Sequence, residues 1–235
     1  MKPIRWIDKA NVAIEGIIYS VRTQRHMRYH LVAALGVLLL SLMVSISRTE
    51  FILLSLAIIL VLVTEMLNTA IEVAVDMISE EYHPKAKIAK DIAAGVVLVA
   101  SIGALILAYL ILYPAIREAV ATGSWRIRKV PNDVIALVAF SVVIIVVVIV
   151  KAVLGTGEPL RGGMPSGHAA VSFSLWIATI YLTGSLPLIA LTFMLAAMVS
   201  WSRWSSGVHR PREVFAGAFL GSGLTLLLFL LFGQR

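Results

Sequence analysis

The chain alternates between long apolar segments and short polar stretches over most of its length. Seven apolar segments are expected as helices, at residues 29–46, 51–75, 88–113, 134–154, 169–183, 186–201 and 214–232. About 20 apolar residues let a helix cross a membrane, and several segments reach that length. The Val and Ile run at 142–150 would suit a buried strand in water, but only helices and closed barrels satisfy the backbone in lipid. The pattern therefore predicts an all-α integral membrane protein with about seven transmembrane helices.

Residues 1–28 have a different pattern, in which isoleucines recur among basic residues. Ile4, Ile7, Ile14 and Ile18 share one face of a helix. Such a segment is typical of an amphipathic helix on a membrane surface. Polar residues interrupt the apolar run that a signal peptide requires, so we expect this surface helix to stay on the chain.

One polar stretch is long enough to be a linker, at residues 114–131. It separates the surface helix and the first three spans from the last four spans. We therefore expect an N-terminal domain at residues 1–113 and a C-terminal domain at residues 132–235.

Composition narrows the class of protein. Charged residues make up 14% of the 235 residues, against about 25% in soluble domains, while hydrophobic residues make up 60%. The lack of cysteine excludes a disulfide scaffold, and the apolar content excludes a disordered chain or an ordinary cytosolic enzyme. The net charge of +7 would suit nucleic acid, but in a membrane protein such an excess more often sets topology. We expect no nucleic-acid partner.

The distribution of Lys and Arg predicts the orientation. With a cytoplasmic N-terminus, 14 of the 20 Lys and Arg residues fall in inside segments and 6 fall outside. The positive-inside rule favours this arrangement. Seven spans then leave the C-terminus outside, and both groups of candidate site residues described next lie on the cytoplasmic face.

The second span carries polar residues on one face. Glu65, Asn68, Glu72 and Asp76 fall within an arc of roughly 80° at helical geometry. An ionisable group costs on the order of 2.5 to 3.5 kcal/mol inside a membrane, so such groups are functional by default. An interhelical hydrogen-bond stripe would explain Asn68 alone, but not four aligned groups.

A charged stretch follows this span at residues 79–91. Acidic groups here could hold Mg²⁺ together with substrate phosphates, while lysines face the phosphates. For Glu80, Glu81 and Lys85, an ordinary solvated loop is the better interpretation.

The run EMLNTAIEVAVD from Glu65 to Asp76, followed by EYHPKAKIAKD ending at Asp91, resembles the small bacterial diacylglycerol kinase and undecaprenol kinase family. Ala13, Gly16 and residues 28–30 also fit and favour the undecaprenol kinase branch. The resemblance covers residues 5–113. It implies a homo-oligomer of trimeric habit in the bacterial inner membrane, acting on a lipid alcohol with ATP and Mg²⁺.

The same resemblance implies roles for individual residues. Glu65 matches the general base that activates the lipid hydroxyl, and Glu72 matches a magnesium ligand. Residues that position nucleotide and metal are matched by Asn68, Asp76, Lys90 and Asp91. Where the family has a second metal-binding glutamate this chain has Gln24, an uncharged ligand, so we expect weaker Mg²⁺ affinity.

The second half carries two further motifs. The first, MPSGHA at 164–169, places Ser166, Gly167 and His168 where a helix begins, which suits a phosphate. Ser166 as an N-cap and His168 as an interfacial histidine remain the alternative.

The second motif, SRWSSGVHRPRE at 202–213, contains Arg203, His209 and Glu213. A carboxylate four residues after a histidine can fix the imidazole tautomer for nucleophilic attack. Arg203 can clamp a phosphate through two hydrogen bonds. Lys151 is a further cation at this membrane face, with a snorkelling anchor as its alternative interpretation.

Together these blocks resemble the type 2 phosphatidic acid phosphatase family over residues 132–232. The resemblance implies a metal-independent phosphatase with a four-helix core, acting on a lipid phosphate. His209 matches the nucleophile that forms a phosphohistidine, and His168 matches the acid that protonates the leaving oxygen. Lys151, Ser166, Gly167 and Arg203 match the phosphate cradle.

Two positions depart from that family's pattern. Glu213 stands where aspartate is usual, which keeps the charge on a longer arm. Glu158 stands where an arginine is expected, and we expect Arg161 to substitute for it in phosphate binding.

We therefore expect a membrane lipid-phosphate enzyme in which a kinase-like module is fused to a phosphatase module. Phosphatidate and an undecaprenyl phosphate or pyrophosphate are the candidate substrates. Two alternatives stay open: a phosphatase with a catalytically dead kinase-like scaffold, and a transporter that uses Glu65 and Glu72 as a proton or cation relay.

Overall fold

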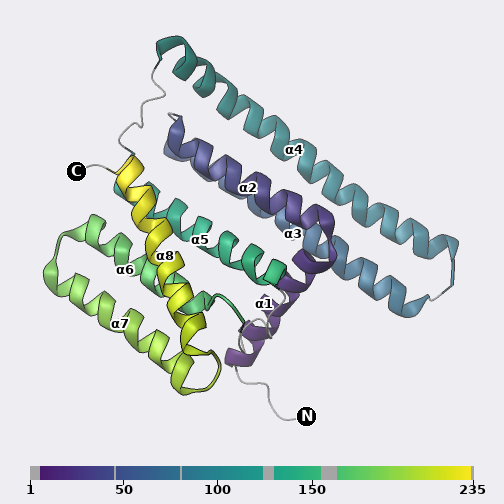
Figure 1. Cartoon of the computed structure of the whole chain (residues 1–235). Helices are drawn as coiled ribbons and strands as arrows, with labels where there is room; N and C mark the ends of the chain where they lie inside the picture. The colour runs from purple at the N-terminus through teal and green to yellow at the C-terminus, as the bar shows by residue number, and fades with distance from the viewer. Residues whose placement is uncertain (1–5, 45, 80, 124–129, 155–162, 234–235) are drawn as a thin grey trace. The chain divides into compact units, whose positions relative to one another are not determined.

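The computed structural model describes residues 6–44, 46–79, 81–123, 130–154 and 163–233, with side chains from residue 12 onward. These residues form helices and connecting turns, and no strand occurs among them. The helices are α1 (Trp6–Thr23), α2 (Arg25–Met43), α3 (Arg48–Ile78), α4 (Pro84–Thr122), α5 (Asn132–Leu154), α6 (Gly167–Thr183), α7 (Leu186–Ser205) and α8 (Pro211–Phe232) (Figure 1). The predicted all-α class is confirmed.

Six of these helices are long and apolar enough to cross a membrane: α2, α3, α4, α5, α7 and α8. The remaining predicted span corresponds to α6, whose 17 residues are fewer than the usual 20 or so. Many large apolar side chains on these helices are exposed, which is expected where lipid replaces water as the solvent. The chain is a multi-pass membrane protein.

The helices group into two compact units. Residues 23–126 form the central unit, and residues 1–22 together with 127–235 form the terminal unit. The surface helix α1 therefore packs with the C-terminal helices, although it belongs to the predicted domain at residues 1–113.

In the central unit, α3 packs against both α2 and α4 (Figure 1). A capping box begins α3, in which Ser47 accepts a hydrogen bond from the Glu50 N–H and the Glu50 carboxylate accepts one from the Ser47 N–H. The helix α4 continues through Pro114 to Thr122, within the stretch predicted as a linker. Ala115 and Ala119 are buried beyond the proline, which explains why the helix does not end there.

In the terminal unit, α6 lies against α5, α7 and α8. Buried polar side chains join α6 to α8, because the Ser174 and Thr225 hydroxyl oxygens lie 2.7 Å apart. Tyr181 of α6 stacks on Phe229 of α8 at a ring-centroid distance of 4.4 Å. These contacts fix α6 and α8 together along most of their length.

Candidate functional site

A histidine–carboxylate pair lies at the connection between α7 and α8. His209 is 3% exposed, and its Nδ1 lies 2.9 Å from Oε2 of Glu213 in the first turn of α8. A carboxylate only accepts hydrogen bonds, so Nδ1 is the donor and Nε2 keeps its lone pair. The Arg210 N–H donates to the same oxygen at 3.2 Å, and the His209 N–H donates to the Arg203 carbonyl at 3.0 Å. Both the carboxylate and the imidazole are thus held in place.

The start of α6 is tied to the same turn of α8. Ser166 is fully buried, and its N–H donates to the Glu213 carbonyl oxygen at 2.9 Å. Gly167 and His168 begin α6 directly after it. One backbone hydrogen bond therefore joins the two motifs, through residues 47 positions apart in the sequence.

Two glycines of α8 allow this close approach. A Cβ at Gly217 would lie 2.2 Å from the Ser166 carbonyl oxygen, and one at Gly221 would lie 1.9 Å from the Ala170 carbonyl oxygen. Real Cβ atoms do not come so close to backbone, so α6 and α8 can pack this way only with glycine at both positions. The spacing of four residues is the small-residue pattern typical of packed membrane helices.

Four buried polar atoms around this pair have no hydrogen-bond partner among the described residues. They are Ser166 Oγ, His168 Nδ1, Arg203 Nε and His209 Nε2. Buried polar groups are nearly always satisfied, so this group calls for an explanation. A phosphate oxygen is an acceptor that suits the Arg203 N–H, the Ser166 hydroxyl and the backbone at a helix N-terminus.

The electrostatics around the two histidines favour an anion. Lys151 is 4% exposed, and the charges of Lys151 and Arg203 act on both His168 and His209. Burial lowers the pKa of His209, and these two cations lower it further, against the opposing effect of Glu213. The imidazole is therefore neutral near pH 7 and its Nε2 is available as a base or nucleophile.

The structure thus gathers seven predicted site residues in the terminal unit: Lys151, Ser166, Gly167, His168, Arg203, His209 and Glu213. Arg161 was expected to replace, in phosphate binding, the arginine whose position Glu158 occupies. Both residues lie outside the described residues.

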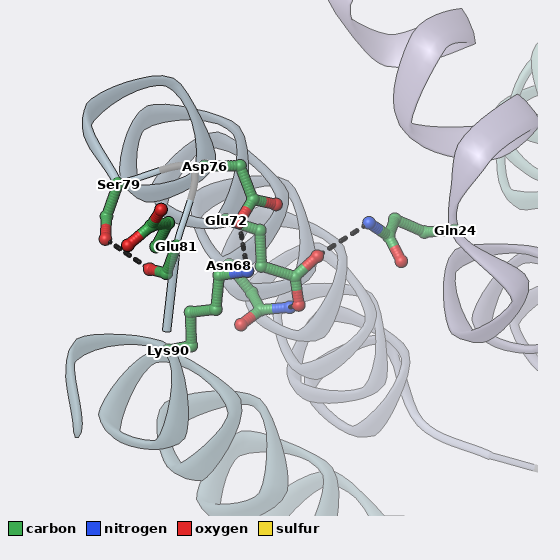
Figure 2. Close-up of polar contacts among 7 residues, drawn as sticks. All are labelled: Gln24, Asn68, Glu72, Asp76, Ser79, Glu81 and Lys90. Atoms are coloured by element: carbon green, nitrogen blue, oxygen red, sulfur yellow. Dashed lines mark hydrogen bonds and ion pairs between the residues drawn. The ribbon is translucent and has the colours of Figure 1, made fainter. Parts of the chain in front are cut away.

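The polar face of α3 in the central unit is organised around Glu72 (Figure 2). Glu72 Oε2 accepts a hydrogen bond of 2.7 Å from Gln24 Nε2, and Oε1 accepts one of 3.0 Å from Asn68 Nδ2. Asn68 Oδ1 is buried and has no partner among the described residues. Glu65, one turn before Asn68, is 2% exposed.

Among the described residues of the charged stretch, Lys90 contacts this face of α3. Lys90, at the start of α4, forms an ion pair with Asp76 near the end of α3 (Figure 2). Asp91 instead lies 3.7 Å from Lys87 on its own helix, and both of these side chains are exposed. The carbonyl oxygen of Glu81 accepts a hydrogen bond of 2.7 Å from the Ser79 hydroxyl. Glu81 and Lys85, for which a solvated loop was the preferred interpretation, are both exposed, and Glu80 lies outside the described residues.

These residues fit Mg²⁺ only as a partial site. No cluster of three or more His, Asp or Glu side chains occurs among the described residues. Mg²⁺ commonly uses one or two carboxylates and takes its other ligands from water and substrate phosphates. Glu72 supplies one carboxylate and Asn68 Oδ1 an amide oxygen, but the Gln24 amide presents its N–H to Glu72.

Sequence reasoning did not single out Gly217, Gly221 or Arg22. The glycines could have been found from their spacing of four in an apolar helix. Arg22 donates from its Nη2 to the Lys151 carbonyl oxygen at 3.2 Å, which no local pattern indicates because 129 residues separate them.

The fold and the two polar sites define a class, that of integral membrane enzymes that transfer or hydrolyse phosphate groups on lipids. The chain belongs to the prokaryotic diacylglycerol kinase family, whose model matches residues 11–112, and to the PAP2 superfamily, whose model matches residues 96–235. The chain thus joins a domain of the lipid kinase family to a domain of the PAP2 phosphatase superfamily, and the predicted order of the two modules is confirmed.

Individual relatives match the kinase part. Undecaprenol kinase of Bacillus subtilis is 41% identical over 99 residues, which cover 42% of this chain and 80% of that protein. Diacylglycerol kinase of Synechocystis sp. is 38% identical over 123 residues, covering 48% of this chain and 70% of that protein. Diacylglycerol kinase of Escherichia coli K12 is 32% identical over 102 residues, which cover 43% of this chain and 84% of that protein. No solved structure matches the chain.

Proposed function

We propose that the terminal unit hydrolyses a lipid phosphate through a phosphohistidine. His209 Nε2 attacks the terminal phosphorus atom, and the bond breaks between this phosphorus and the oxygen that stays with the lipid, which in a pyrophosphate is the bridging oxygen. His168 gives a proton to that oxygen as it leaves. Water then attacks the phosphohistidine and gives a proton to His168, so that the P–N bond breaks, inorganic phosphate is released and both histidines are restored. Phosphatidate and undecaprenyl phosphate or pyrophosphate are the proposed substrates.

One observation carries this proposal: the 2.9 Å hydrogen bond between His209 Nδ1 and Glu213 beside an unpartnered Nε2. The bond fixes the tautomer that a nucleophile needs, and the carboxylate stabilises the positive charge that the ring gains after attack. Arg203, Ser166 and the Gly167 N–H are proposed to hold the phosphate oxygens. Lys151, and Arg161 as the substitute for the family's arginine, are proposed to add positive charge where negative charge develops.

The test is phosphate release from a labelled lipid phosphate by purified protein in detergent. His209→Ala is expected to abolish release, because no other group in the proposed mechanism can form the covalent intermediate. His26→Ala, which changes an exposed histidine of α2, is the matched control and is expected to keep full activity. Unchanged release in His209→Ala would refute the assignment.

For the central unit we propose an ATP-dependent lipid kinase, on undecaprenol or diacylglycerol, that Gln24 weakens. Glu65 would take the proton of the lipid hydroxyl, and Glu72 with Gln24 would bind the metal. Asn68, Asp76, Lys90 and Asp91 are proposed to position the nucleotide. Bound Mg²⁺ supplies charge neutralisation at the nucleotide phosphates.

The Gln24–Glu72 hydrogen bond supports the weakened site. The amide N–H occupies one carboxylate oxygen that would otherwise face the metal, and the amide adds no negative charge. Gln24→Glu is therefore expected to raise ATP-dependent phosphorylation and lower the Mg²⁺ concentration needed for half-maximal rate. Arg25→Glu adds the same acidic group one residue on, at an exposed position, and is expected to change neither quantity.

The same measurements separate the alternatives. If neither the wild-type protein nor Gln24→Glu phosphorylates the lipid, the catalytically dead kinase-like scaffold is favoured. A transporter would show ion or lipid flux that depends on Glu65 and Glu72, and that function has no use for the His209–Glu213 pair.

A further inference from the structure

A cavity of about 360 Å³ lies within the terminal unit between α1, α5 and α6. Its volume is within the range of about 300 to 1,000 Å³ typical of small-molecule sites. Three helices supply the lining: Ile14, Ile17 and Ile18 from α1; Phe140, Ile144, Val147, Val148 and Lys151 from α5; Gly167, His168, Val171 and Ser172 from α6.

The polar and apolar residues that line the cavity are separated along its length. Its wall on α5 is apolar from Phe140 to Val148 and ends at Lys151. Its wall on α6 starts at Gly167 and His168, two residues of the proposed phosphate site, and continues to Val171. One end of the cavity is therefore cationic and carries hydrogen-bonding groups, and the rest is lined by apolar side chains with the single exception of Ser172. A phosphate joined to a long apolar chain has the same polarity.

We propose that this cavity holds the part of the substrate's hydrocarbon chain next to its phosphate, and that α1 is the wall that selects the chain. The proposal rests on the phosphatase function proposed above. The selecting residues are Ile14 and Ile17, whose side chains line the cavity from α1.

The position of α1 is fixed by contacts inside the terminal unit. Ile18 is 1% exposed and lines the cavity together with residues of α5 and α6, so this face of α1 is packed. Arg22 donates to the Lys151 carbonyl oxygen in the last turn of α5, where helix carbonyls have no partner within the helix. Residues 11–22 belong to the kinase family match and yet complete the phosphatase cavity.

The test compares two substrates and two tryptophan variants. Ile17→Trp fills the cavity, whereas Val12→Trp places the same side chain at a 61% exposed position of the same helix. With a long-chain lipid phosphate, Ile17→Trp is expected to raise KM about tenfold with kcat nearly unchanged, a cost of about 1.4 kcal/mol in chain binding. With a short-chain alkyl phosphate, KM is expected to stay at the wild-type value. Val12→Trp is expected to match wild type on both substrates.

Ile17→Ala guards against a folding defect in the tryptophan variant. The smaller side chain enlarges the cavity, so the preference is expected to shift toward bulkier, branched chains. An equal loss on long and short substrates in both Ile17 variants, or no loss on either, would overturn the proposal.

A binding measurement separates failure of this proposal from failure of the proposed function. The probe is an alkyl phosphate with a photoreactive group on the chain a few carbons from the phosphate, added to full-length His209→Ala protein. Crosslinks are expected in the peptide that contains Ile14 and Ile17, whether or not wild-type protein hydrolyses the probe. Crosslinks that avoid α1 would overturn the chain site, while absent hydrolysis in wild type would overturn only the phosphatase assignment.

Discussion

His209 combines two properties that a nucleophilic imidazole needs. Burial and the charges of Lys151 and Arg203 lower its pKa, so that the neutral ring prevails at physiological pH. Glu213 holds the ring through Nδ1 and directs the lone pair to Nε2. The carboxylate acts in the opposite direction on the pKa, because it stabilises the protonated ring.

Because Glu213 both fixes the tautomer of His209 and raises its pKa, Glu213→Gln is expected to change both kcat and the pH profile of the phosphatase. Loss of the fixed tautomer is expected to lower kcat by a factor on the order of 10² to 10⁴. Loss of the charge removes a contribution that raises the pKa of His209, so the acid limb of the kcat/KM profile is expected to move to lower pH. In wild type that limb is expected below the ordinary histidine pKa of about 6.5.

A pH–rate profile of wild type, Glu213→Gln and Glu213→Asp checks both effects. Aspartate keeps the charge, so Glu213→Asp is expected to retain most of the activity and the wild-type acid limb. An acid limb that moves to higher pH in Glu213→Gln would contradict the account of this pair.

Much at this scale could be predicted from the sequence, because the contacts are local. The spacing of four predicted that Glu213 could reach His209, and the two are hydrogen-bonded. The Ser166–Glu213 and Arg22–Lys151 hydrogen bonds could not be predicted, because each joins segments whose approach depends on the packing of whole helices.

At the scale of elements, the packing of α8 on α6 builds the site. Gly217 and Gly221 let the two backbones meet, and that meeting brings Ser166 to the first turn of α8. The lengths of the apolar segments predicted the helices well. The end of α4 was harder to predict, because a proline usually ends a helix and the residues around Pro114 carry no pattern that indicates otherwise. The helix continues because Ala115 and Ala119 beyond the proline are buried.

The contact between these helices predicts opposite results for two glycines of α8. Gly221→Ala puts a Cβ 1.9 Å from the Ala170 carbonyl oxygen, so the helices must separate. We expect a loss of about 1 to 3 kcal/mol in stability, together with reduced phosphatase activity. Gly223→Ala, where nothing lies within 4 Å of the new Cβ, is expected to be neutral or slightly stabilising.

Thermal unfolding in detergent, followed by activity at a permissive temperature, measures both variants. Equal stability of the two alanine variants would show that the close approach of α6 and α8 does not govern the site.

At the scale of the whole molecule, two enzyme families share one chain, and the helix α1 links them in an unexpected way. Residues 11–22 match the kinase family, but α1 is part of the terminal unit. A domain boundary drawn from sequence segments cannot show this, because a short helix can pack with either neighbour. The trimeric assembly implied by the kinase resemblance stays a prediction.

The apolar segments predict seven spans, of which α6 is the short one, and with seven spans the distribution of Lys and Arg predicts a cytoplasmic N-terminus and a C-terminus outside. Both proposed sites would then face the cytoplasm, and kinase and phosphatase would act on lipids of the same leaflet. A tag after Arg235 is expected to be cleaved by protease added to sealed cells. A protected tag would contradict this topology, and with it the placement of the phosphatase site on the inner face.

The central claim is that His209 carries the phosphate during lipid-phosphate hydrolysis. Trapping of the intermediate tests it most directly: protein is mixed with a lipid labelled in its phosphate, denatured at alkaline pH, digested and analysed by mass spectrometry. The account predicts acid-labile phosphate on the peptide that contains His209, and none in His209→Ala. Hydrolysis that proceeds without label on His209, or with label on another residue, would contradict it.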